Sequence, residues 1–299
     1  MNWTEPKNEG DTFFFDFSRK KETQLMHPLD AAFFTINYIT KNYPPPYTLL
    51  LSGGVDSQAM LYAWHLSKVP FETCSAVYNY NLNDHDLSTL KEFATIHNIK
   101  INFVDFDLFN FLENEFEKYS DAYLCGSPQI CTHMKIADTV IGGTTIMSGN
   151  FIENNCLKPL TTNIVCLWHY KRLSNRPVIP FFFLETEELA WSFNNYSIDP
   201  KNLPNLSNTA YIQKVKALHH YGFPVIPQAK KYNGFEKVKV WYDENYKNPI
   251  PMENKLVRVV GQGSNRIFDL LYRNKYEAKF SKYKYVKNFR QSSKNYTGI

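Results

Sequence analysis

The sequence lacks any run of 18 or more apolar residues, so it predicts no transmembrane helix and no membrane partner. Its first residues, Met1 to Glu5, do not have the basic and then apolar order of a secretory signal. Cysteine is scarce, with 5 in 299 residues, and an odd number does not suit a disulfide framework. No Gly-Lys-Ser/Thr occurs, which excludes a Walker-type phosphate loop. We therefore expect a reduced protein in the cytoplasm.

A strong excess of one charge is also missing, because 33 basic and 29 acidic residues give a net charge of +4. The basic excess lies in the tail 272–299, which holds eight Lys or Arg and one acidic residue. Aromatic residues alternate with these lysines, and such a mixture binds the phosphates and bases of nucleic acids. The spacing of Tyr276, Phe280 and Tyr283 equally fits the buried face of a terminal helix. Both interpretations of the tail stay open.

Short apolar runs alternate with segments of helical spacing along much of the chain. The expected strands are Tyr47–Leu51, Phe71–Asn79, Lys100–Phe106, Thr144–Ser148 and Pro177–Phe183. The expected helices are Asp30–Asn42, Asp56–Ser67, Asp86–Asn98, Leu108–Tyr119, Gln129–Val140 and Glu185–Asn194. This alternation predicts an α/β fold, with a Rossmann-like, doubly wound parallel sheet.

The pattern changes near Asn195, where prolines and asparagines indicate a linker. Helical spacing returns at Tyr211–Tyr221 and Phe235–Asn245 without further strands. We expect three regions: an N-terminal extension over 1–24, an α/β domain over 25–195, and a mostly helical C-terminal appendage over 196–299.

One loop carries the clearest chemical signal. Residues 52–57, with the sequence SGGVDS, lie between the first expected strand and the helix after it, where parallel sheets bind ligands. Gly53 and Gly54 let the backbone approach a ligand, and the hydroxyls of Ser52 and Ser57 add donors. The N-terminus of the next helix directs its N–H groups to the same place. The loop is suited to a phosphate.

Asp56 is the exception in this loop, because a carboxylate repels a polyphosphate unless a cation lies between them. Mg²⁺ prefers one carboxylate together with phosphate oxygens. The sequence therefore predicts Asp56 as a metal ligand. A glycine turn capped by Asp56 and Ser57 is the purely structural alternative.

These six residues match the SGGxDS signature of the N-type ATP pyrophosphatases, the PP-loop superfamily, and the chain resembles that family over 25–195. Val55 at the variable position resembles the amide-forming branch, which includes the synthetase domain of asparagine synthetase. The resemblance implies an adenine nucleotide alpha hydrolase-like fold that uses ATP and Mg²⁺ and releases AMP and pyrophosphate. It places Leu51, Ser52, Gly53, Gly54, Val55, Asp56 and Ser57 around the phosphates, with Asp56 and Ser57 in catalytic positions.

The resemblance extends to later segments. It implies that the backbone of Val77 and Tyr78 holds the adenine, and that Gly149 and Asn150 end a strand whose loop closes over ATP. The family's acidic pair beyond Gly149 is reduced here to Glu153, an implied second metal ligand.

A departing pyrophosphate also needs fixed cations. Lys158 is the candidate catalytic cation, and further candidates are Lys171, Arg172, Arg176, Lys230 and Lys231. A solvated basic loop is the structural alternative.

Cys125, Cys131 and His133 lie close together in sequence, with Cys156, Cys166 and His169 further on, and thiolates and imidazoles could bind zinc or an iron–sulfur cluster. Their spacing matches no metal-ligand pattern, and buried free cysteines are the alternative.

Departures from the family leave the acceptor open. No Cys stands at position 2, which argues against a built-in glutaminase, and no Cys-x-x-Cys pair supports thiolation chemistry. The composition, and the PP-loop domain followed by a helical appendage, also resemble asparagine-synthetase-like proteins of large tailed phages. This resemblance implies a location in the host cytoplasm.

We consider three hypotheses. The first is an enzyme that adenylates a carboxylate or amide of a small-molecule or macromolecular acceptor, for attack by a nitrogen nucleophile. The second is a PP-loop enzyme that modifies a tRNA or DNA base and uses the tail 272–299 as its anchor. The third is a nucleotide-binding or structural protein that has lost turnover.

Overall fold

The computed structural model describes residues 25–123, 125, 127–149, 166–195, 210–228, 237–238 and 241 of the chain. Several predictions fall outside these residues: the extension 1–24, the tail 272–299, and the candidate site residues Asn150, Glu153 and Lys158.

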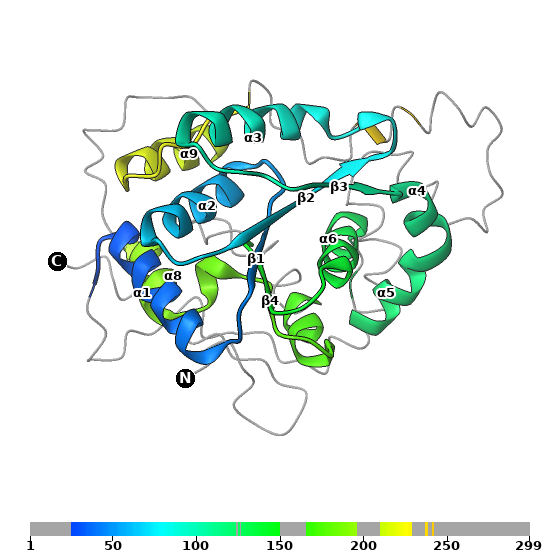
Figure 1. The fold of residues 1–299 in the computed structure, drawn as a ribbon, viewed down its shortest axis with the longest axis horizontal. Helices are drawn as coiled ribbons and strands as arrows, with labels where there is room; N and C mark the ends of the chain where they lie inside the picture. The colour runs from blue at the N-terminus through cyan, green and yellow to red at the C-terminus, as the bar shows by residue number, and fades with distance from the viewer. Residues whose placement is uncertain are drawn as a thin grey trace.

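Five parallel strands form one sheet in the order β3-β2-β1-β4-β5 (Figure 1). They are β1 (Tyr47–Leu50), β2 (Glu72–Tyr78), β3 (Phe103–Phe106), β4 (Thr144–Met147) and β5 (Val178–Ile179). Leu50 of β1 pairs in register with Cys74 on one side and Met147 on the other, so β1 is the central strand. The strand order reverses between β1 and β4. The predicted doubly wound, Rossmann-like α/β sheet is therefore confirmed.

Helices connect the strands and cover both faces of the sheet. They are α1 (Pro28–Asn42), α2 (Val55–Ser67), α3 (Asp84–His97), α4 (Leu108–Asn110), α5 (Phe116–Tyr123), α6 (Pro128–Thr139), α8 (Glu187–Asn195) and α9 (Ala210–His220). A π-helical stretch, Phe111–Glu115, joins α4 to α5, short 3₁₀ turns cover Asn79–Asn81 and Phe182–Leu184, and residues 166–173 are also helical.

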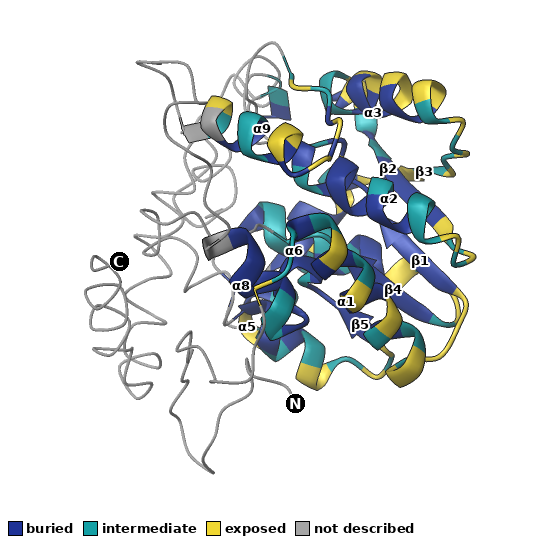
Figure 2. Cartoon of the chain, turned by 90° about the vertical axis from the view of Figure 1, so that its left-hand side faces the viewer, coloured by how far each residue is buried: buried dark blue, intermediate teal, exposed yellow. Residues whose placement is uncertain are grey.

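The sheet separates two apolar cores because successive side chains of a strand point to opposite faces. Leu49 contributes to the core formed with α1, α2, α3, α8 and α9. Its neighbour Leu50 contributes to the core formed with α4, α5, α6 and residues 166–173. Figure 2 shows the buried strands between helices whose exposed residues face outward. A strand buried on both faces reads as a continuous apolar run, and this is the pattern that predicted β1.

Two strands are shorter than predicted. The strand expected over Pro177–Phe183 is reduced to Val178–Ile179, and Phe182–Leu184 forms a 3₁₀ turn. Pro180 lacks the N–H that a sheet ladder needs, so it ends β5. The strand expected over Lys100–Phe106 is also shorter, because the Asn102 N–H donates to the Thr73 side chain at 2.9 Å. The pairing of β3 with β2 begins at Phe103.

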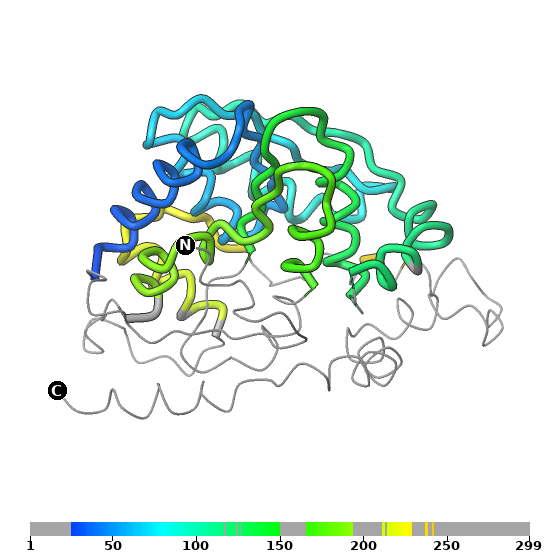
Figure 3. Tube along the Cα trace, turned by 90° about the horizontal axis from the view of Figure 1, so that it is seen from below, coloured from blue at the N-terminus to red at the C-terminus, as the bar shows by residue number. Residues whose placement is uncertain are grey.

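Segments far apart in sequence meet beside the sheet. Figure 3 shows α8 next to α1, and the two helices are in contact. Val215 and Leu218 of α9 are buried in the same core as Met60 of α2. Among the described residues, no helix is long and apolar enough to span a membrane.

Candidate nucleotide site

The loop after β1 adopts a backbone that its glycines permit. Gly53 has φ +86, a conformation that L side chains rarely adopt, and a Cβ there would overlap the backbone carbonyl of Asp86 in α3. The loop therefore lies directly against the first turn of α3. Glycine at position 53 is required both by its own φ and by this close approach.

Hydrogen bonds within the loop hold its shape. The Ser57 hydroxyl is buried and donates to the Gly54 carbonyl at 2.8 Å. Ser52 is exposed, and its Oγ lies 3.4 Å from the Gly54 nitrogen. No side chain of the described residues caps the N-terminus of α2 at Gly54. The Ser52 hydroxyl itself donates to Ser57 Oγ at 3.5 Å. Among the described residues, no side chain therefore competes with a ligand for the first N–H groups of α2.

Asp56 lies in the first turn of α2 with its two oxygens in different surroundings. Its Oδ2 accepts from Lys214 Nζ at 2.7 Å. Its Oδ1 is buried and has no hydrogen-bond partner among the described residues. The side chains of Asp56 and Lys214 are only 16% and 8% exposed, so the ion pair is shielded from water. Sequence reasoning found Asp56 but not Lys214, which is 158 residues away.

The segment that carries Lys214 is held to the same end of the sheet by a second contact. Gln58 of α2 donates to the Ile226 carbonyl at 3.1 Å and accepts from the Ile226 N–H at 2.7 Å. Gln228 donates to the Asp86 carboxylate, and its N–H donates to the Tyr211 hydroxyl at 3.0 Å. Residues 210–228 therefore form one wall of the site.

A pocket of about 450 Å³ lies at the carboxyl ends of β2 and β3. Its lining includes both residues predicted to hold adenine, and the full set is Val77, Tyr78, Asn79, Tyr80, Asn81, Asp105, Phe106 and Asp107. Because β2 is the neighbour of β1 in the sheet, this pocket and the loop after β1 lie at the carboxyl ends of adjacent strands.

Two residues of the pocket have unusual backbone conformations. Tyr80 and Asn81 have φ of 55° and 54°, in the left-handed region that non-glycine residues seldom occupy. Tyr80 is 69% exposed as a residue, and its ring stacks on that of Trp241 with 5.0 Å between the centroids. Phe109 lies 4.3 Å from the same indole ring. The pocket therefore has an aromatic rim together with two carboxylates, Asp105 and Asp107.

The strand end at Tyr78 is already hydrogen-bonded. The Tyr78 N–H donates to Asn83 Oδ1 at 3.0 Å, and Asn83 Nδ2 donates to the Ala76 carbonyl at 2.8 Å. Burial, together with the nearby Asp86 carboxylate, raises the pKa of the Tyr78 hydroxyl. A base in this pocket would have to displace Asn83 to use the Tyr78 amide, or bind through other groups of the lining.

The loop after β4 reaches the neighbouring position on the sheet. Gly149 has φ +64, and a Cβ there would contact the Phe181 ring too closely, so this position also needs glycine. Because β1 and β4 are adjacent, Gly149 and the loop 52–57 follow the two strands between which the order reverses. Asn150, Glu153 and Lys158, predicted to act beside Gly149, are outside the described residues.

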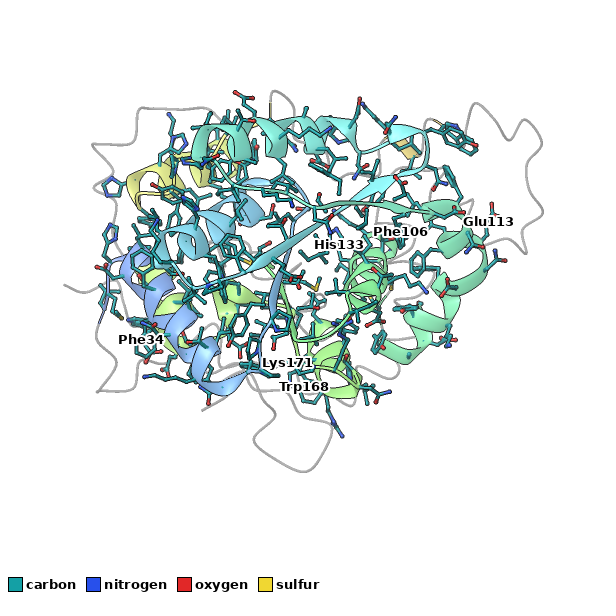
Figure 4. The ribbon with its side chains drawn as sticks, in the orientation of Figure 1. Phe34, Phe106, Glu113, His133, Trp168 and Lys171 are labelled. Carbon is teal, nitrogen blue, oxygen red and sulfur yellow. The ribbon has the colours of Figure 1, made fainter. Side chains whose placement is uncertain are left out.

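Two basic residues considered for pyrophosphate binding have structural partners instead. Lys171 Nζ lies 2.9 Å from a carboxylate oxygen of Glu185, which is only 4% exposed and also accepts from the Tyr43 hydroxyl. Arg176 donates to the backbone carbonyl of Ala137 and to other carbonyls before β4. Figure 4 labels Lys171 low in the view, near Trp168. Lys171 and Arg176 therefore stabilise the fold through these contacts.

Cys125, Cys131 and His133 lie in or just before α6, and their surroundings can be compared with the metal-site interpretation only over the described residues. Within the described part of the chain, no cluster of three or more His, Cys, Asp or Glu side chains is arranged to hold a metal ion. Cys125 and Cys131 are free and buried in the apolar core beside α6. Burial lowers the pKa of His133 to about 4, so its ring is neutral near pH 7. Burial of both thiols without a disulfide is what the alternative interpretation of buried free cysteines predicts.

Comparisons with known proteins add little to this geometry. No protein-family model matches the chain, and no curated protein matches it. A solved structure of NMN synthetase from Francisella tularensis is 12% identical, and the match covers 76% of this chain and 98% of that one. Its TM-score is 0.32, too low to support an argument. The fold assignment therefore rests on the strand order and on the two cores.

Proposed function

We propose that this chain is an ATP-dependent adenylating enzyme that cleaves ATP between its α- and β-phosphates. The observation that carries the proposal is Asp56 Oδ1, a buried carboxylate oxygen without a hydrogen bond among the described residues. Leaving a buried acceptor unsatisfied costs free energy, and such groups often mark a site that a ligand completes. Asp56 lies in the first turn of α2, where the helix N-terminus and the glycine loop favour a phosphate. A metal ion bound between the carboxylate and the phosphate would supply the partner that Oδ1 lacks among the described residues.

The residues of the loop would act by position and charge. The N–H groups from Gly53 to Ser57 and the exposed Ser52 hydroxyl would bind the phosphate oxygens, while the buried Ser57 hydroxyl keeps the loop in shape. Asp56 would hold Mg²⁺, which supplies neutralisation of the phosphate charge when bound. No side-chain nucleophile is needed, because orientation and charge stabilisation can accelerate adenylyl transfer to an oriented acceptor.

The adenine would occupy the pocket at the ends of β2 and β3. Its aromatic rim offers a stacking surface at Tyr80, and the carboxylates of Asp105 and Asp107 offer acceptors for an exocyclic amine. Both ATP and AMP carry adenine, so Tyr80→Ala should weaken the binding of both equally. This outcome separates a base-binding role from a phosphate-binding role.

For the acceptor we keep the asparagine-synthetase-like hypothesis. A carboxylate or amide oxygen of the acceptor forms a bond to the α-phosphorus, and the bond to pyrophosphate breaks. A nitrogen nucleophile then displaces AMP. The support is the SGGxDS match with Val55 at its variable position.

Product analysis tests the proposal. ATP labelled in the α-phosphate is incubated with the full chain, Mg²⁺, ammonium and a mixture of carboxylate and amide acceptors, and the products are separated by thin-layer chromatography. We expect labelled AMP, which Asp56→Asn abolishes and Asp84→Asn retains, because Asp84 is 60% exposed and pairs with Lys237. Labelled ADP in place of AMP would overturn the proposal.

A further inference from the structure

Lys214 is the residue of α9 that reaches into the nucleotide site. Its side chain is 8% exposed and its ammonium lies 2.7 Å from Asp56 Oδ2. Burying an ammonium costs free energy unless a counter-charge pairs with it. The packing of α9 places this ammonium beside Asp56, which supplies that counter-charge. The carboxylate is thus neutralised on one oxygen, while its second oxygen, Oδ1, is left without a hydrogen bond among the described residues.

The surroundings of Lys214 hold its backbone in place. One residue on, Val215 is buried in the core shared with α2, and Leu218 one turn later is fully buried there. The reciprocal hydrogen bonds between Gln58 and Ile226 fix the chain that follows α9 against α2. The helix is therefore anchored by contacts other than the ion pair. The lysine side chain, with its flexible four-carbon stem, is the part that can change partners.

We propose that Lys214 is a second cation of the nucleotide site, which exchanges partners when a nucleotide binds. In the free protein its ammonium neutralises Asp56. When the phosphates arrive with a divalent metal at Asp56, the ammonium moves from the carboxylate to a phosphate oxygen. This inference rests on the proposed function, since it needs phosphates beside Asp56.

The exchange predicts opposite effects on two ligands. For a divalent metal alone, Lys214 is a competitor, because its positive charge repels a cation from the same carboxylate. For a metal–nucleotide complex, Lys214 is a ligand, because it adds a charge-assisted hydrogen bond to phosphate. A lysine that only held α9 in place would not change the two affinities in opposite directions.

The experiment compares the full-length chain with Lys214→Met, and uses Lys216→Met on the same helix as a matched control. Mn²⁺ binding without nucleotide is followed by electron paramagnetic resonance, and binding of Mg·ATP by calorimetry. In Lys214→Met we expect Mn²⁺ to bind about tenfold more tightly, because the competing charge is gone. We expect Mg·ATP to bind roughly tenfold to a hundredfold more weakly, because a charged contact is lost. Lys216→Met should resemble the wild type in both measurements.

The outcomes separate this inference from the proposed function. A wild-type chain that binds no Mg·ATP would refute the proposed function itself. Tight Mg·ATP binding by the wild type, with both affinities unchanged or moved the same way in Lys214→Met, would overturn the role of Lys214 alone. Lys214→Gln retains a donor to Asp56 without the charge, and it should show the same opposite changes. If both variants fail to fold, the lysine is a structural partner of Asp56 and the proposal is wrong.

Discussion

The close approach of Gly53 to α3 makes Gly53→Ala an informative perturbation. Alanine at φ +86 carries a backbone penalty of about 1–2 kcal/mol, because its Cβ crowds the neighbouring backbone. The new Cβ would also overlap the Asp86 carbonyl, which is backbone and cannot rotate away. Forcing extra volume into a packed contact costs about 1–3 kcal/mol more. We therefore expect a loss of about 2–5 kcal/mol in the free energy of unfolding.

Gly142→Ala is the matched control for this prediction. Gly142 has φ +76, but a Cβ there would meet nothing within 4 Å, so only the backbone penalty applies. The difference between the two variants in urea unfolding isolates the contact with Asp86. We also expect Gly53→Ala to weaken Mg·ATP binding in calorimetry, since the loop must move away from α3, while Gly142→Ala leaves it unchanged. Equal stability of the two variants, with nucleotide binding intact in both, would refute the reasoning.

Three further predictions follow from the same structure. Asp56→Asn should weaken Mg·ATP binding far more than AMP binding in calorimetry, because the carboxylate acts on the metal and not on the base; an equal loss for both ligands would contradict the metal role. Burial lowers the pKa of His133 to about 4, so the unfolded chain binds a proton first as pH falls, and the free energy of unfolding should decline from about pH 6.5 towards pH 4 by about 1.4 kcal/mol per pH unit. Urea midpoints across this range test it, and His133→Gln should flatten the profile; an unchanged profile would show that His133 is not the cause. Lys171→Met leaves the buried Glu185 carboxylate without its cation and should lower the free energy of unfolding in urea by about 3 kcal/mol, with nucleotide binding retained. Loss of Mg·ATP binding in a folded variant would instead show that Lys171 contributes to the nucleotide site.

The sequence alone determined the local elements of this protein. The apolar run Tyr47–Leu51, the two glycines after it and the helical spacing beyond Asp56 predicted a strand, a turn and a helix, and these elements form as expected. Such patterns can be read from sequence because strand and helix periodicity depend on residues that are near one another in the chain. The alternation of these units also predicted the parallel sheet, since right-handed crossovers allow few other arrangements.

Only the tertiary structure decided which distant residues complete the site. Nothing near Lys214 in the sequence indicates that it pairs with Asp56. The sequence equally gives no sign that Lys171 pairs with Glu185, or that Arg176 donates to backbone carbonyls. A charged side chain carries the same local signal whether it faces solvent, a carboxylate or a ligand. Its partner is selected by how α9 and the helix at 166–173 pack on the sheet, and that packing depends on contacts across more than a hundred residues of chain.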